Sequence, residues 1–63
     1  MGFKVKEMRE DRRMTQEELA QKSGVSRTTI VAIENGSTKD VLASTLLKLA
    51  AALDTTVSEI FFD

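Results

Sequence analysis

Residues 15–36 read TQEELAQKSGVSRTTIVAIENG and contain two short helical patterns separated by a glycine. The first pattern opens with Thr15, which is followed three positions later by Glu18. This is the spacing of a capping box, in which the threonine hydroxyl accepts a hydrogen bond from the Glu18 amide and the carboxylate accepts one from the Thr15 amide. The spacing predicts a helix over residues 16–23.

The second pattern predicts a helix over residues 27–35, which Ser26 is suited to cap. Gly24 separates the two helices, because glycine adopts the left-handed conformation of a helix end without a steric penalty. Two helices that cross at about 90–120° need a small residue where they meet and apolar anchors on the second helix. The residues at these positions are Ala20, Gly24, Val25, Ile30 and Ile33.

Apolar periodicity extends the helical pattern on both sides of this stretch. Upstream, Val5 and Met8 have i, i+3 spacing, which predicts a helix from Lys4 to Arg12 or Arg13. Downstream, leucines recur at i, i+4, i+7 and i+11, which predicts a fourth helix with a stripe buried along its length. These leucines are Leu42, Leu46, Leu49 and Leu53.

A short fifth helix is predicted at the end of the sequence. Thr56 and Glu59 repeat the capping-box spacing. The residues that this helix would carry into the core are Val57, Ile60 and Phe61. The sequence therefore predicts an all-α fold of five helices, in a single domain over residues 1–63.

The composition excludes several classes of function. The 63 residues include no Cys and no His, so a disulfide framework and the usual nitrogen and sulfur metal ligands are absent. Tyr and Trp are absent as well, and we expect no catalytic site, no cofactor and no enzyme activity. No apolar run is long enough for a signal peptide or a transmembrane helix, so we expect a soluble, cytoplasmic protein.

The charged residues are unevenly distributed. A net charge of −1 and a pI near 5.3 are low for a protein that coats nucleic acid, which needs a basic excess. Residues 1–13 nevertheless carry five basic and three acidic groups, whereas residues 40–63 carry one lysine and four acidic groups. An acidic far side lowers non-specific affinity for DNA while leaving local contacts available.

The stretch TQEELAQKSGVSRTTIVAIENG, with MREDRRM before it and LLKLAAALDTTVSEIF after it, resembles the helix-turn-helix family of the phage Cro and cI repressors, also called the xenobiotic-response-element family. The resemblance covers nearly the whole chain. It implies a compact lambda-repressor-like domain with the helix-turn-helix in its second and third helices. It also implies a sequence-specific DNA-binding transcriptional regulator, and specifically a repressor that binds a two-fold symmetric operator as a homodimer.

The same resemblance implies roles for individual residues. Phosphate contacts are implied for Thr15, Gln16, Ser26, Asn35 and Lys39. Base-edge contacts are implied for Arg27, Thr28 and Ala32, with Val31 beside them. An arginine can bind guanine through two hydrogen bonds, and small apolar groups can pack against thymine methyls. Arg9 and Glu34 match a pair that joins the first helix to the end of the third.

The sequence departs from the family pattern at four positions. Ala32 stands where relatives often carry a long polar or basic side chain, which reduces the expected hydrogen-bond readout of bases. Arg13 and Asp54 stand where glycine often follows a helix, and Val41 stands where proline is frequent.

Two alternatives accompany this interpretation. The negative net charge and the apolar Val31 and Ala32 also suit a protein-interaction module, such as an antitoxin-like domain with weak or no DNA binding. Leu47 and Phe62 lie outside the predicted core pattern, so they are either part of a dimer interface or isolated apolar residues on the surface. With no second domain, we expect no small-molecule effector.

Overall fold

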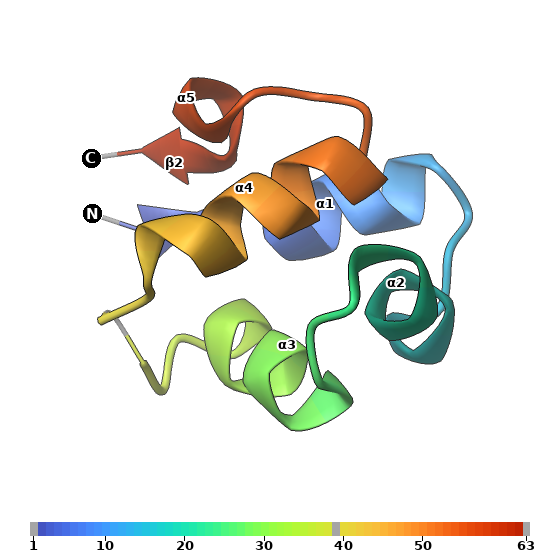
Figure 1. Cartoon of the computed structure of the whole chain (residues 1–63), viewed down its shortest axis with the longest axis horizontal. Coiled ribbons are helices and arrows are strands. Elements are labelled where there is room, and N and C mark those ends of the chain that lie inside the picture. The colour runs from blue at the N-terminus through green and yellow to red at the C-terminus, as the bar shows by residue number, and fades with distance from the viewer. Residues whose placement is uncertain (1, 39, 63) are drawn as a thin grey trace.

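The computed structural model describes residues 2–38 and 40–62 and contains within them five helices and one pair of two-residue strands (Figure 1). The elements are β1 (Gly2–Phe3), α1 (Val5–Asp11), α2 (Gln16–Ser23), α3 (Arg27–Glu34), α4 (Ala43–Ala52), α5 (Val57–Ile60) and β2 (Phe61–Phe62). The predicted all-α class and the order of the helices are confirmed. The strand pair was not predicted.

The start and end of α2 follow from its capping residues. The Thr15 hydroxyl accepts a hydrogen bond from the Glu18 amide at 3.0 Å, and the Glu18 carboxylate accepts one from the Thr15 amide at 2.9 Å. The hydrogen bond from the Thr15 amide, and after it the Thr15 side chain beside the carboxylate, hold the pKa of the Glu18 carboxyl below its usual range. The helix ends at Gly24, whose φ of 76° lies in the left-handed region. The predicted capping box and turn are confirmed.

The predicted capping box of the last helix is wrong. The backbone of Thr56 is extended at the start of α5, but its side chain makes no capping hydrogen bond. Its hydroxyl instead lies 3.1 Å from the Ser58 hydroxyl and 3.4 Å from a carboxylate oxygen of Glu59. These side-chain contacts take the place of the bonds to the backbone.

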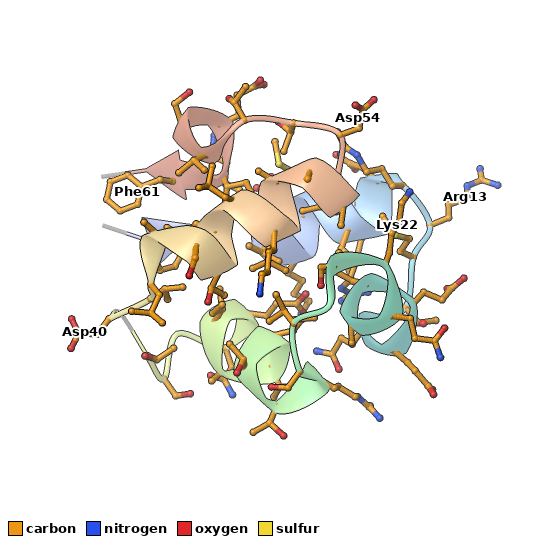
Figure 2. The ribbon with its side chains drawn as sticks, in the orientation of Figure 1. Arg13, Lys22, Asp40, Asp54 and Phe61 are labelled. Carbon is orange, nitrogen blue, oxygen red and sulfur yellow. The ribbon has the colours of Figure 1, made fainter. Side chains whose placement is uncertain are left out.

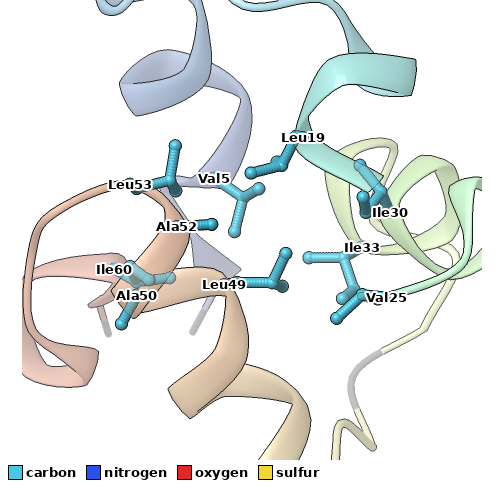
Figure 3. Packing of buried hydrophobic residues seen from close by; sticks show 10 residues of the cluster. All are labelled: Val5, Leu19, Val25, Ile30, Ile33, Leu49, Ala50, Ala52, Leu53 and Ile60. Carbon is cyan, nitrogen blue, oxygen red and sulfur yellow. The ribbon is translucent and has the colours of Figure 1, made fainter. Parts of the chain in front are cut away.

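The core lies between α4 and the other helices, with α5 on one side of α4 and α2 and α3 on the other (Figure 1). Figure 3 shows its side chains pointing toward a common centre. The buried residues are Val5, Leu19, Val25, Ile30, Ile33, Leu49, Ala50, Ala52, Leu53 and Ile60. The two anchors predicted on α3 and the last two leucines of the predicted stripe are therefore confirmed as core.

Two residues predicted to be buried are not. Leu42 is 74% exposed, because it precedes α4 as an extended N-cap residue and does not share the helical stripe. Phe61 is 37% exposed, because the chain leaves α5 before it and continues as β2. Its ring packs edge to face against Phe3, with the ring centres 5.7 Å apart. Leu46 and Val57, which were also predicted to lie in the core, are only partly buried.

The strand pair joins the two ends of the described chain. β1 and β2 are antiparallel, with Phe3 opposite Phe61. The amide of Lys4 extends this pairing by donating a hydrogen bond to the carbonyl of Ile60. The start of α1 is thereby fixed to the end of α5. None of the helices within the described residues is long and apolar enough to cross a membrane.

Candidate nucleic-acid interface

The helix α3 has one buried face and one face open to solvent. Ile30 and Ile33 anchor its inner face in the core, and Val25 in the preceding turn is also buried. At its start the Ser26 hydroxyl accepts a hydrogen bond from the Thr29 amide at 3.2 Å and donates one to the Thr29 hydroxyl at 2.9 Å. The helix is therefore held by both packing and its cap, while its outer side chains remain available to a partner.

The four residues predicted to contact bases all lie at this surface. Arg27 and Thr28 are exposed, and Val31 and Ala32 are half-buried. Thr28 presents a hydroxyl and a methyl group, and Val31 and Ala32 present only methyl groups. Such a face can form a bidentate contact to guanine and van der Waals contacts to thymine methyls.

The start of α2 lies beside the start of α3. Thr15, Gln16 and Arg27 line one hollow together with Arg9 and Glu17. The first backbone amides of a helix have no partner within the helix, and their dipoles favour anions. The structure thus brings together the predicted phosphate contacts at the start of α2 and the predicted base contact of Arg27.

Arg9 and Glu34 form the predicted internal ion pair. The guanidinium donates from Nε at 2.7 Å and from Nη2 at 3.1 Å to the two oxygens of the carboxylate. Both side chains are almost fully buried, and these hydrogen bonds raise the pKa of Arg9 above its usual value. Because a third nitrogen of Arg9 donates to the carbonyl of Met14, this group also fixes the loop that follows α1.

Gln16 belongs to the same network, which the sequence did not indicate. Its Nε2 donates a hydrogen bond to the Oε1 atom of Glu34 at 3.0 Å. A side chain predicted to contact phosphate is therefore oriented from behind by a buried carboxylate. The spacing of 18 residues between the two carries no helical signal, because the contact depends on how α2 packs against α3.

The remaining predicted contacts lie at the other end of α3. Asn35 is exposed at the C-cap, and its Oδ1 accepts a hydrogen bond from the Ser37 amide at 2.9 Å. Lys39 lies outside the described residues. Beyond it, exposed Asp40 lines an apolar hollow between α3 and the start of α4. The other residues around this hollow are Thr28, Thr29, Ala32, Thr38, Val41, Leu42 and Thr45.

Comparison with known proteins agrees with this geometry. A family model described as helix-turn-helix matches residues 5–60. The chain belongs to the helix-turn-helix family. This helix-turn-helix protein is similar to a solved structure, that of the restriction-modification controller protein C.AhdI from Aeromonas hydrophila, with 36% sequence identity and a TM-score of 0.84. The similarity covers 92% of the present chain and 86% of the C.AhdI chain. No match was found among curated proteins.

Family membership and this structural likeness together identify a helix-turn-helix protein that acts as a DNA-binding transcriptional regulator. The buried anchors and the two helix caps account for the rigid placement of α3. One further basic residue, Lys6 of α1, lies at the edge of the same surface and was not predicted to take part.

Proposed function

We propose that the protein is a cytoplasmic transcriptional repressor that binds a two-fold symmetric operator as a homodimer, with α3 of each protomer in the major groove. The observation that carries this proposal is the outer face of α3, where Arg27 and Thr28 are exposed on a helix anchored in the core. The major groove of B-DNA is wide enough to admit a helix in this way.

In this complex two sets of residues have different tasks. Arg27 reads a guanine, while Thr28, Val31 and Ala32 contact neighbouring thymine methyls. Thr15, Gln16, Ser26, Asn35 and Lys39 hold the phosphate backbone, which fixes the register of α3 without reading sequence. The hydrogen bond from Gln16 to Glu34 supports this role, since it limits the rotamers of the glutamine before DNA arrives.

The dimer supplies the second half of the operator. Leu47 is 62% exposed on α4, whose buried residues are Leu49, Ala50 and Ala52, and we assign it to the interface between protomers. Phe62, the other residue proposed for this interface, has its side chain outside the described residues. A symmetric dimer places its two recognition helices about 34 Å apart, which matches successive major grooves.

The likeness to a restriction-modification controller protein suggests where to search for the operator. If the chain controls restriction-modification genes, its operator lies upstream of those genes. A protein bound at the operator excludes other proteins from the same stretch of DNA.

Selection from a random duplex library at low salt tests the proposal. We expect the wild-type protein to enrich a two-fold symmetric site, and Arg27→Ala to lose the preference at one base position in each half-site. Lys22→Ala is the matched control, because Lys22 is exposed near the end of α2, and Figure 2 places it away from the outer face of α3. Failure of the wild type to enrich any site would overturn the proposal and favour a protein-interaction module.

A further inference from the structure

A shallow hollow at the C-terminal end of α3 is lined by residues from three helices. Its lining residues are Lys6 of α1, Gln16 of α2, Val31 and Glu34 of α3, and Asn35 at the C-cap of α3. Gln16 and Asn35 are the two amides already proposed to contact phosphates. Lys6 has no part in the helix-turn-helix scaffold, and its side chain is exposed.

The charges around this hollow favour an anion. The Glu34 carboxylate is already engaged, because Arg9 donates two hydrogen bonds to it and Gln16 donates a third. Within residues 2–38 and 40–62 the ammonium of Lys6 has no hydrogen bond or ion pair, although Glu10 follows it by four positions in α1. Because the positive charge of Arg9 neutralises the negative charge of Glu34, the Lys6 ammonium leaves a net positive charge on the wall of the hollow.

The two amides add donors to this positive charge. Each amide nitrogen carries two N–H groups, and Gln16 uses one of them for Glu34. The oxygen of the Asn35 amide is occupied by the Ser37 amide, which leaves its nitrogen as the donor. One ammonium and two amide nitrogens around a single hollow provide N–H donors and no uncommitted carboxylate, which is a chemistry suited to phosphate.

We propose that Lys6 binds a backbone phosphate of the DNA at this hollow, so that α1 contributes to DNA binding together with α2 and α3. The inference rests on the proposed function, since the phosphate reaches the hollow only when α3 lies in the groove. A contact of this kind strengthens binding to every sequence equally and adds to its salt dependence.

The test compares Lys6→Gln with wild type on the selected operator and on a random duplex of equal length. We expect weaker binding to both duplexes by the same factor, and a slope of log affinity against log salt that is smaller by about 1. Between 50 and 200 mM salt the loss of affinity should therefore be about fourfold smaller for the variant than for the wild type. Lys6→Arg should restore the slope, and the thermal unfolding of all variants should be unchanged because the side chain is exposed.

Lys22→Gln is the matched control, because it removes the same charge from an exposed position away from the face of α3 (Figure 2). Equal slopes for Lys6→Gln and Lys22→Gln, with the wild type binding normally, would overturn the Lys6 site and leave the proposed function intact. Weakening confined to the operator would also overturn it, because a phosphate contact does not read sequence. If the wild type bound neither the operator nor the random duplex, the proposed function would be overturned, and the Lys6 site with it.

Single methylphosphonate substitutions in the operator locate the phosphate. One neutralised position should weaken the wild type and leave the affinity of Lys6→Gln unchanged, because the variant has already lost that contact. Equal weakening of both proteins at every position would contradict a contact between Lys6 and a phosphate.

Discussion

Asp40 is an acidic residue on the side of the molecule that we propose faces DNA. It is exposed, and it lines the same hollow as Thr28 and Ala32. In the proposed complex the phosphate charges would repel this carboxylate, and the repulsion would be strongest at low ionic strength. We therefore expect Asp40→Asn to raise DNA affinity by about two- to fivefold in low salt, with a smaller gain at high salt. A binding titration at several salt concentrations measures this effect.

Asp54→Asn is the control for Asp40→Asn. Figure 2 shows the two aspartates at opposite ends of the molecule, so the control removes the same charge far from the proposed interface. Asparagine also tolerates the positive φ of 54° at this position. An equal gain from both variants would mean that only net charge matters, and that Asp40 has no local effect.

Arg13 is a strained residue at the turn after α1. Its φ is 55°, a left-handed value that costs a non-glycine residue about 1–2 kcal/mol, whereas glycine adopts it freely. Part of the gain from glycine is offset by its larger entropy in the unfolded chain. Arg13→Gly should therefore raise the free energy of unfolding by about 0.5–1 kcal/mol, measured by urea denaturation. Arg13→Ala keeps the Cβ atom, and equal stability of the two variants would contradict the strain.

At the scale of single residues, the sequence predicted contacts that depend on local spacing. The Thr15–Glu18 capping box is one of these, and the pair of Arg9 and Glu34 was implied by the family resemblance. The hydrogen bond from Gln16 to Glu34 and the place of Lys6 were not predicted. Both depend on the packing of three helices against one another, which no spacing along the chain encodes.

Among the helices, α4 begins without a side-chain cap. Leu42 has φ −61° and ψ 142°, almost the same backbone conformation as Ser26, whose hydroxyl caps α3. The amide of Thr45 already donates a hydrogen bond to the carbonyl of residue 42 at 3.0 Å, so a serine hydroxyl at position 42 would accept one from the amide of Ser44 or share that of Thr45. We expect Leu42→Ser to be more stable than Leu42→Ala by about 1 kcal/mol, which thermal unfolding would show as a higher Tm. Both variants remove the same exposed leucine, so equal Tm values would exclude a cap.

At the scale of elements, the helices were predictable, but the residues at which they begin and end were less so. The helix α2 has the predicted bounds because residues at both of its ends signal its limits. The leucine periodicity predicted α4, but it could not show that Leu42 lies before the first turn. The strands β1 and β2 are two residues long and pair the two ends of the chain, so no periodicity could have indicated them.

Across the whole molecule, the packing around α4 leaves Leu47 as a large apolar side chain in solvent. It is 62% exposed, although Leu49 of the same helix and Leu53 at its C-cap are fully buried. Burying such a side chain against a second protomer stabilises a dimer by about 1.5–3 kcal/mol, and an isologous interface buries it twice. We expect Leu47→Gln to weaken dimerisation by at least about tenfold, measured by sedimentation equilibrium. The folded monomer should persist, because the side chain contributes little to the core.

The DNA-binding consequence of Leu47→Gln separates the dimer interface from the DNA-binding surface. Since α3 is unchanged, the variant should still recognise a single half-site with wild-type preference, but it should lose the added affinity of two half-sites spaced one helical turn apart. Leu42→Ser removes a leucine that is also largely exposed, at the start of α4, and should leave sedimentation unchanged. If Leu47→Gln remained as dimeric as the wild type, the protomers would have to meet through a different surface, and the spacing of the half-sites would then identify it.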